Sequence, residues 1–313
     1  MKTKIPQSKI YLASPRGFCA GVTRAVEAVD NLLKLDTNKS DNLYIYHEIV
    51  HNQYIIKNFK KKGVRFINSL HEIPAGTEKI VISAHGAGPE IFAQAKSKEM
   101  QIIDATCPIV DSIHKIIQHL SSKGYTILLI GHPKHDEIIG SQGWSRENIK
   151  IIDSLETAKT VEIEANTKLA WLSQTTLSIS DTKKIVDILN LRFPNIVNPK
   201  KSCICYATQN RQNAVQALVD KVDKIIVIGS KNSSNTQRLY EIASSLAPSY
   251  QIDNEKQIKE NMLAENIGIT AGASVPNILI EKVINKISQK VHIVQIFENV
   301  TVAETLKFPP VKF

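Results

Sequence analysis

The sequence predicts an α/β fold with mainly parallel β-sheets, and three observations support this. Ile and Val dominate the apolar residues while aromatic residues make up only 6%, a composition typical of buried parallel strands. Short apolar runs recur, and each ends in a polar or Gly-containing loop followed by a stretch with helical spacing, which is the pattern of β-loop-α units. The pattern also repeats around a cysteine about every hundred residues, so the 313-residue chain is expected to contain several related units.

Three cysteines mark the repeat, each in a loop after an apolar run. Cys19 lies in YLASPRGFCAGV, Cys107 in IIDATCPIV and Cys205 in ICYATQNRQ. The separations are 107 − 19 = 88 and 205 − 107 = 98 residues, so each cysteine is expected to open one α/β unit. The helices predicted after the cysteines span 22–35, 110–120 and 214–222, and the predicted units span 1–106, 107–202 and 203–313, the last with a C-terminal tail.

Six further loops follow apolar runs, two in each unit, and carry polar side chains. They read YIYHEIVHNQY and VISAHGAGPE, then LLIGHPKHDEI and LAWLSQTTLS, then VIGSKNSSNTQ and GITAGASVP. Open parallel sheets bind ligands at the carboxyl ends of their strands. If a pseudo-threefold axis relates the units, all nine loops converge on one central cavity. The alternative is three independent α/β units with scattered loop residues.

The three repeated cysteines are candidate ligands of an iron–sulfur cluster. Thiolates suit both Fe–S clusters and zinc, but structural zinc sites usually show close pairs such as C-x2-C, and these cysteines lie far apart. A cubane cluster held by three cysteines leaves one iron open, a Lewis acid beside an electron source that suits reductive removal of a hydroxyl group. A single cysteine is more often a small buried apolar residue. We expect that role for Cys203, which has no counterpart in the other units.

Histidines and a glutamate in the loops are candidates for binding and proton transfer. His51, His85 and His135 could donate hydrogen bonds to phosphate or a hydroxyl group and relay protons near neutral pH. Glu137, two residues after His135, could deliver protons if a closed cavity raises its pKa; the alternative is an ordinary surface carboxylate at a helix start. The other histidines are expected to be solvated: His47, His71, His114, His119, His132 and His292.

Hydroxyl and amide side chains form a second group of candidates. The segment Ser233-Ser234-Asn235 follows an apolar run and precedes a helix predicted over residues 236–246, where free backbone N–H groups favour anions. Ser274 and Thr175 lie in similar loops. Such residues also serve as N-caps, and both roles can hold together. Neither a P-loop nor a G-x-G-x-x-G after a strand is present in the sequence, so ATP and NAD binding lack support.

The bulk composition excludes several classes of protein. The net charge is +9 and the isoelectric point about 9.2, but the basic residues are dispersed apart from the run 60–62, which argues against nucleic-acid binding and leaves a role in steering an anionic substrate. Four cysteines do not make a disulfide scaffold. The N-terminus lacks the apolar region of a signal peptide, and no apolar run approaches the ~18 residues of a membrane span. We therefore expect a cytoplasmic protein.

At these loops the sequence resembles the 4-hydroxy-3-methylbut-2-enyl diphosphate reductase family, which catalyses the last step of the methylerythritol phosphate route to isoprenoids. The resemblance covers about residues 10–290. It implies a trefoil of three α/β/α domains around an oxygen-sensitive [4Fe–4S] cluster with ligands Cys19, Cys107 and Cys205. The motifs that carry the resemblance are SPRGFCAGV, HNQY, SAHG, DATCP, QTTLS, ICYAT-x-NRQ, GSKNSSN and TAGAS.

The resemblance also implies a reaction. Two electrons, from a ferredoxin or flavodoxin, and two protons would expel the substrate hydroxyl as water and give isopentenyl or dimethylallyl diphosphate, in a monomer or homodimer. Residues matching the family's diphosphate-holding positions are His51, His85, Ser233, Asn235 and Ser274, with Ser234 beside them; those matching the residues around the hydroxyl are His135, Thr175 and Glu137, the last as proton donor.

The sequence departs from the family pattern at one position and leaves rival functions open. The family usually reads His-Pro-Glu where this chain has His135-Asp136-Glu137, which removes the rigidity that proline gives the loop. A quinolinate synthase-like enzyme or a dehydratase would also use three cysteines, but a dicarboxylate substrate usually needs an Arg fork, for which Arg16 is the obvious candidate. A non-enzymatic Fe–S or zinc protein would not need Glu137 or Thr175, and an RNA-binding protein would show steeply salt-dependent affinity.

Overall fold

The computed structural model describes residues 7–35, 43–199 and 203–313, whose paired strands are all parallel and form three sheets. The fold class predicted from the sequence, α/β with mainly parallel sheets, is confirmed. The chain divides into two compact units. The first, called the terminal unit, comprises Met1–Ala20, His51–Gln53 and Tyr206–Lys307; the second, called the central unit, comprises Gly21–Val50, Tyr54–Cys205 and Phe308–Phe313.

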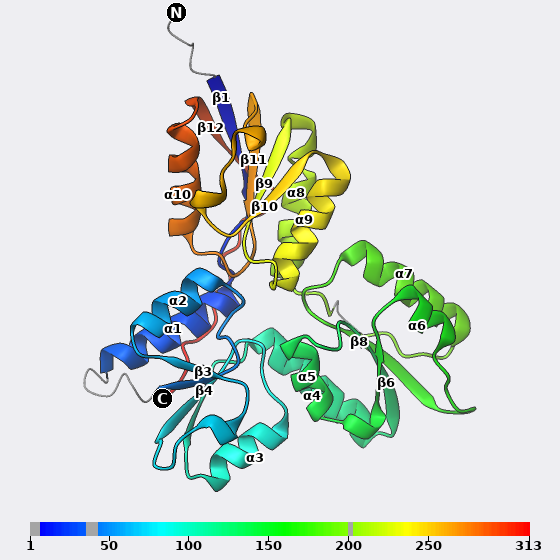
Figure 1. The fold of residues 1–313 in the computed structure, drawn as a ribbon. Coiled ribbons are helices and arrows are strands. Elements are labelled where there is room, and N and C mark those ends of the chain that lie inside the picture. Colours follow the sequence, from blue (N-terminus) through cyan, green and yellow to red (C-terminus); the bar gives the residue numbers. More distant parts are fainter. Residues whose placement is uncertain (1–6, 36–42, 200–202) are drawn as a thin grey trace, which may run out of the picture. The chain divides into compact units, whose positions relative to one another are not determined.

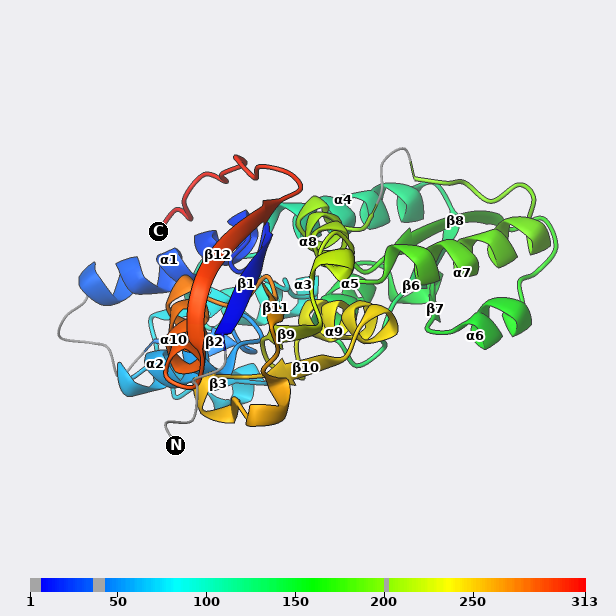
Figure 2. The same ribbon diagram turned by 90° about the horizontal axis from the view of Figure 1, so that it is seen from above.

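The terminal unit contains one five-stranded sheet covered by helices on both faces (Figure 1). Figure 2 shows the long strand β12 running beside β1 at one edge. The strands, in sheet order, are β10 (Ser249–Ile252), β9 (Lys224–Ile228), β11 (Asn266–Ala271), β1 (Gln7–Ser14) and β12 (His292–Val300). The helices are α8 (Tyr206–Gln216) and α9 (Ser234–Leu246) on one face and α10 (Asn277–Ser288) on the other.

The central unit contains two smaller sheets, each with its own helices. The first sheet has the order β3 (Arg65–Ile67), β2 (Tyr44–Tyr46), β4 (Lys79–Ile82) and β5 (Gln101–Asp104). The second has the order β7 (Ile149–Ile152), β6 (Tyr125–Ile130) and β8 (Lys168–Ser173). The helices are α1 (Ala20–Leu35), α2 (Gln53–Lys61), α3 (Pro89–Ser97), α4 (Pro108–Ser122), α5 (Asp136–Gly143), α6 (Leu155–Thr160) and α7 (Ile179–Arg192), the first residues of α1 and α2 belonging to the terminal unit.

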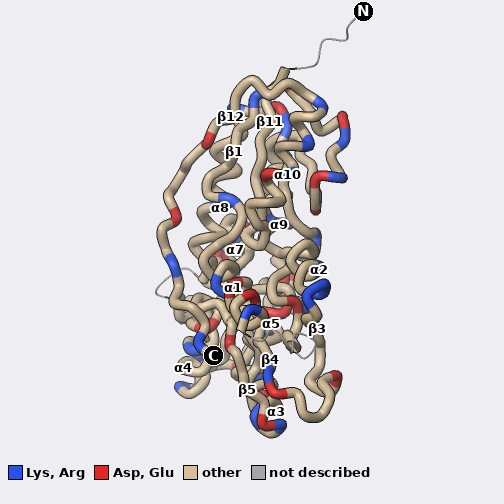
Figure 3. Tube along the Cα trace, turned by 90° about the vertical axis from the view of Figure 1, so that its left-hand side faces the viewer, with Lys and Arg blue, Asp and Glu red and all other residues tan. Residues whose placement is uncertain are grey.

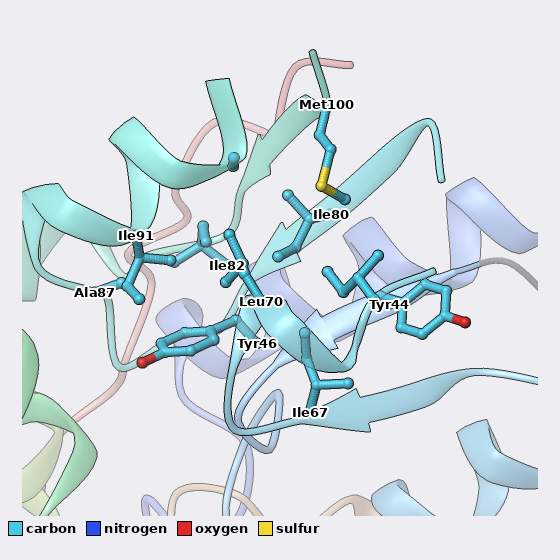
Figure 4. Close-up of a cluster of buried hydrophobic side chains, with 11 residues drawn as sticks. Tyr44, Tyr46, Ile67, Leu70, Ile80, Ile82, Ala87, Ile91 and Met100 are labelled. Atoms are coloured by element: carbon cyan, nitrogen blue, oxygen red, sulfur yellow. The ribbon is translucent and has the colours of Figure 1, made fainter. Parts of the chain in front are cut away.

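Apolar side chains at alternating strand positions build the cores. In the first sheet of the central unit, Tyr46 of β2 pairs in register with Ile67 of β3 and Ile82 of β4. The three therefore share one face, because successive side chains of a strand point to opposite faces. Figure 4 shows them packed with Ile91 of α3. This buried face fixes the register of β4, whose carboxyl end carries one of the candidate loops.

The first strand belongs to a different sheet from the one that the sequence predicted. Residues 7–14 were expected in the first α/β unit, but β1 pairs with β11 and β12 near the C-terminus. Buried parallel strands have similar compositions, so the local sequence does not specify which strands pair. As a result the chain passes between the two compact units next to Cys19 and directly after Cys205. The trefoil and the boundaries 1–106, 107–202 and 203–313 stay predictions.

The helix after Cys205 was predicted in the wrong place. It was expected over residues 214–222, but α8 begins directly after the cysteine at Tyr206 and ends at Gln216. The polar residues Thr208, Arg211 and Gln212 of this helix are all buried, so no apolar face is visible in its sequence. The two other helices predicted after cysteines and the helix predicted over 236–246 are confirmed within two residues at each end.

The surface charge is dispersed, as the sequence predicted. Figure 3 shows Lys and Arg spread along the trace and interleaved with Asp and Glu. Among the described residues, none of the helices has the length and apolar character needed to cross a membrane.

Candidate active site

One group of candidate residues lies at the carboxyl edge of the sheet in the terminal unit. Cys19 follows β1, Ser233 and Asn235 follow β9, and Ser274 follows β11. These three strands are neighbours and parallel, so the loops emerge side by side. The backbone N–H of Cys19 donates to the carbonyl of Ala273 at 3.2 Å, which joins the first of these loops to the third.

Asn235 is the most unusual side chain of this edge. It is 4% exposed, and neither its Oδ1 nor its Nδ2 atom has a hydrogen-bond partner. A buried polar group without a partner is costly, and most such groups in native proteins have one. Ser233 caps α9 by accepting from the N–H of Thr236 at 3.4 Å. The start of α9 therefore presents an unsatisfied amide where the helix dipole favours an anion.

Ser274 contributes differently, because its hydroxyl is already engaged. Its Oγ donates to the backbone carbonyl of His51 at 2.9 Å, and the N–H of Gln53 donates to Ser230 Oγ at 3.4 Å. The segment His51–Gln53 is thus attached to this sheet edge within the terminal unit. Ser234, the first residue of α9, is partly exposed beside them.

In the central unit, His85 and Cys107 follow the neighbouring parallel strands β4 and β5. The N–H of Cys107 donates to the carbonyl of Ala84 at 3.0 Å, so the two loops are adjacent. Cys107 is the N-cap of α4, where the helix dipole favours negative charge. A Cβ atom at Gly21 would lie 2.5 Å from Cys107 Sγ, so only glycine leaves the sulfur room on that side.

Glu137 and Thr175 form a buried pair at the carboxyl edge of the second sheet of this unit. Glu137 is 3% and Thr175 5% exposed. Glu137 Oε1 accepts from the Thr175 N–H at 2.7 Å, and Oε2 accepts from Thr175 Oγ1 at 2.9 Å. The alternative of a surface carboxylate is thereby wrong. The carbonyl of Thr175 accepts from the N–H of Cys205 at 2.9 Å, which ties a predicted cluster ligand to the pair.

His135 lies at the start of α5, the helix that carries Glu137. It is the N-cap of α5, and its Nδ1 atom accepts from the N–H of Glu137 at 3.2 Å. An Nδ1 atom that accepts places the proton of the neutral ring on Nε2. The ring of His85 meets that of His135 edge-on, with centroids 5.8 Å apart. The central unit therefore brings His85, His135, Glu137 and Thr175 together, as the sequence predicted for the three loops that carry them.

Asp136, the residue that departs from the family pattern, forms an unpredicted contact. Its carboxylate lies 3.1 Å from His47 Nδ1 and 3.9 Å from His85 Nδ1. His47 was expected to be solvated; that prediction is wrong, because its side chain is 16% exposed and paired with Asp136. Burial, followed by the charges of Glu90 and Asp136, raises the pKa of nearby Tyr46. The carboxylate in place of proline thus gives His47 and His85 an acidic neighbour.

The prediction that His114 is solvated is also wrong. It is 3% exposed, its ring stacks on Trp144 with centroids 5.5 Å apart, and its Nε2 atom has no partner. Burial lowers its pKa to about 4. The sequence contained the signal, because His114 shares a helical face with Val110 and Ile117 of α4.

The cysteines differ in their surroundings. Cys19, Cys107 and Cys205 are partly exposed, Cys203 is buried, and none of the four forms a disulfide. Cys203 packs in an apolar cluster with Ile113, and burial raises the pKa of its thiol. Three partly exposed thiols, one of them beside a glycine that leaves space, suit a soft metal cluster. The burial of Cys203 supports its predicted lack of a role.

Comparison with known proteins gives one consistent result. The model of the LytB protein family matches residues 10–288. A protein of Wolbachia sp. subsp. Brugia malayi named 4-hydroxy-3-methylbut-2-enyl diphosphate reductase is 44% identical over 287 residues, 91% of this chain and 93% of the relative. A Streptomyces coelicolor protein of the same name is 41% identical, over 92% of this chain and 85% of its own length.

Solved structures agree with the sequence comparisons. The E-1-hydroxy-2-methyl-but-2-enyl-4-diphosphate reductase of Plasmodium falciparum superposes with a TM-score of 0.89 at 33% identity, covering 98% of this chain and 96% of that one. A second structure, described as the terminal enzyme of the non-mevalonate pathway, gives a TM-score of 0.65 at 32% identity and covers 90% and 99% of the two chains.

Proposed function

Because the chain belongs to the LytB protein family, we propose that it reduces 4-hydroxy-3-methylbut-2-enyl diphosphate to isopentenyl and dimethylallyl diphosphate. The prediction that it is an oxidoreductase of this family is confirmed by the comparisons. In the proposed reaction two electrons and two protons enter, the C–O bond to the hydroxyl breaks, a C–H bond forms and water leaves. We expect the electrons to come from a reduced ferredoxin or flavodoxin in the cytoplasm.

The single observation that carries this proposal is the buried Glu137–Thr175 pair. A reductive dehydroxylation needs a proton for the departing hydroxyl and a second for carbon, and both must be delivered where bulk water is excluded. When Glu137 is protonated, the 2.9 Å contact with Thr175 Oγ1 can reverse its direction. The threonine hydroxyl then passes its own proton to a neighbouring acceptor and takes up the proton of Glu137, which is left as a carboxylate. His135, with its proton on Nε2, orients the substrate hydroxyl from the same helix start.

A [4Fe–4S] cluster would be held by Cys19, Cys107 and Cys205. When bound, such a cluster supplies electrons, and its iron without a protein ligand acts as a Lewis acid toward the substrate hydroxyl. The chemistry of the donor set fits, since the three thiols are partly exposed and Gly21 leaves room beside Cys107 Sγ.

The substrate's diphosphate would be bound by His51, His85, Ser233, Asn235 and Ser274, with Ser234 beside them. The unsatisfied amide of Asn235 at the start of α9 supports this, because its Nδ2–H groups can donate to phosphate oxygens. No Arg fork for a dicarboxylate is available at Arg16, whose Nη1 and Nη2 atoms both donate to Glu298, at 2.8 and 2.7 Å. This pairing disfavours the quinolinate synthase-like and dehydratase alternatives.

An anaerobic preparation tests the proposal. We expect about four iron and four sulfide ions per chain and, with reduced methyl viologen, conversion of the hydroxylated diphosphate to both isoprenoid diphosphates. Cys107→Ser should lose iron and activity, whereas the matched Cys203→Ser should keep both. Iron-replete protein that leaves this substrate unchanged, or Cys107→Ser protein with full iron content, would contradict the proposal.

A further inference from the structure

The largest fully buried side chain of the terminal unit is that of an arginine. Arg211 of α8 is 0% exposed, whereas arginines are almost never fully buried unless they are paired. A buried guanidinium with incomplete partners would strongly destabilise the fold. Its position therefore implies a full set of acceptors, and their identity shows what the residue holds in place.

Two of these acceptors belong to the loop that carries Cys19. Arg211 Nη2 donates to the carbonyl of Gly17 at 2.8 Å and to that of Phe18 at 3.3 Å, and Nε donates to Gly17 at 3.1 Å. On the other side of the loop, the N–H groups of Gly17 and Cys19 donate to carbonyls at the end of β11 and just beyond it, at 3.1 and 3.2 Å. The backbone before Cys19 is thus bound from both sides.

The remaining acceptors come from α8 itself and from the segment after β12. Arg211 Nη1 donates to the Ala207 carbonyl at 2.8 Å and to Glu304 Oε1 at 3.0 Å, and Nη2 reaches Glu304 Oε2 at 3.2 Å. Asn210 Nδ2 also donates to Glu304 Oε1, at 3.0 Å. Glu304 is 14% exposed, so its charge compensates the guanidinium away from most of the solvent.

Glu304 lies at the end of a segment that follows the Cys19 loop closely. Within this segment, the carboxylate of Glu298 accepts hydrogen bonds from both Nη atoms of Arg16. Thr301 donates two hydrogen bonds to the Ser14 carbonyl, one from its N–H and one from its hydroxyl, each at 3.0 Å. The segment 298–304 therefore contacts the loop 14–18 directly at Arg16 and Ser14, and Glu304 reaches the loop through Arg211. It also lies beyond residue 288, where the family-model match ends.

We propose that Arg211 and Glu304 are positioning residues that hold the Cys19 thiol in place for the cluster, and that segment 298–304 acts as a strap for that purpose. This inference rests on the proposed function for the role of Cys19. The geometry within the terminal unit is independent of it. Gly17, at φ +68°, adopts a left-handed conformation, and Arg211 holds its carbonyl.

The test measures the thiols directly, on protein from which iron has been removed. Limiting iodoacetamide is followed by mass spectrometry of each cysteine peptide, and the ratio of Cys19 to Cys107 alkylation is recorded. We expect Glu304→Gln to raise this ratio at least tenfold, because the loop carbonyls lose a fixed donor. Glu281→Gln, an exposed position on α10, is the matched control and should leave the ratio unchanged.

A second variant separates loop positioning from general destabilisation. Arg211→Met with Glu304→Leu removes both charges together, so no uncompensated charge stays buried. We expect this double variant to fold, as judged by its melting curve, and to keep the raised Cys19 ratio. A ratio within twofold of wild type in the double variant would overturn the proposal.

The labelling result also stays distinct from the proposed function. If wild-type protein binds no iron, the proposed function fails, but the alkylation ratio still decides whether Arg211 and Glu304 position Cys19. If wild-type protein binds iron, Glu304→Gln protein should lose its iron several-fold faster on exposure to a chelator. Alkylation of Cys107 is the internal reference for the reactivity of Cys19.

Discussion

The carboxyl edges of two sheets, one in each unit, carry buried polar side chains that differ in whether they have hydrogen-bond partners. At the edge of the central unit, Glu137 has its acceptors filled by Thr175. At the edge of the terminal unit, Asn235 is equally buried and has no partner. A proton donor must be aligned before the reaction begins, whereas a group that binds an anion must still have donors to offer. Under the proposed function, Glu137 and Thr175 form the pair that delivers protons, and the partner of Asn235 is the diphosphate of the substrate.

The largest effect is expected from a change in the hydrogen-bonded pair of Glu137 and Thr175, which tests one side of this comparison. Glu137→Gln keeps the shape and one acceptor but removes the acidic proton, so kcat should fall by roughly 10²–10⁴-fold at unchanged iron content. Turnover with reduced methyl viologen measures this. Glu147→Gln, at an exposed position near α5, should behave as wild type, and an unchanged kcat in Glu137→Gln would exclude the acid role.

A second buried group without a partner, His114 of α4, sharpens the comparison through pH. An unfolded histidine takes up a proton near pH 6.5, but His114 stays neutral in the fold down to about pH 4. The free energy of unfolding should therefore fall as pH drops from 6.5 to 4, by at most about 3 kcal/mol. Below pH 4 this residue should cause no further loss.

Urea unfolding at pH 7 and pH 5 measures this effect. His114→Leu should flatten the dependence, while His119→Leu on the exposed side of α4 should not. His114 packs behind Gly86 in the loop after β4, where a Cβ atom would lie 2.6 Å from its Cε1 atom. It is not one of the proposed binding residues, so the KM of His114→Leu at pH 7 should stay within about twofold of wild type. A large rise in KM would mean that a buried group without a partner affects binding even when it only packs behind a strand-end loop.

The unsatisfied amide itself predicts opposite effects on stability and on binding. Asn235→Leu removes a buried group that lacks a partner, so the free energy of unfolding should stay level or rise by about 1 kcal/mol. The same change should raise KM for the diphosphate substrate by roughly 5–30-fold, because phosphate oxygens lose a donor. Asn285→Leu on the exposed face of α10 is the control. A stability loss together with an unchanged KM would assign Asn235 a structural role only.

The smallest expected effect concerns Asp136. Its contact with His47 is partly exposed, and such pairs contribute about 0–1 kcal/mol. Asp136→Asn and Asp136→Pro should therefore change kcat/KM by about fivefold or less, with Asp187→Asn in an exposed ion pair as reference. A tenfold loss in Asp136→Pro would show that this chain depends on the carboxylate where the family usually has proline.

The sequence was sufficient for the strand-end loops, because each is visible locally as an apolar run followed by polar residues. It predicted that His85, Glu137 and Thr175 follow strands, and the structure places them so. Cys205 differs: within the described residues no strand directly precedes it, and α8 follows at once.

What the sequence could not provide was long-range pairing. The attachment of β1 to β11 and β12 depends on contacts across most of the chain. The contact between Arg211 and Glu304 could not be predicted for the same reason, because the two residues are far apart in the chain. In addition, a buried arginine in a helix cannot be told from a surface arginine by sequence alone. The contact between Asp136 and His47 was not predicted, because nothing in the local sequence of either residue shows that they lie close together.

The pairing of β1 with β11 and β12 has a consequence for biosynthesis. The N-terminal strand is translated first, yet its neighbours in the sheet begin at residues 266 and 292. At typical translation rates, roughly 10–50 seconds pass between the synthesis of β1 and the synthesis of these neighbouring strands. Throughout that interval the nascent Cys19 loop has neither its sheet nor the strap, so we expect insertion of a metal cofactor at Cys19 only after residues 292–304 have left the ribosome.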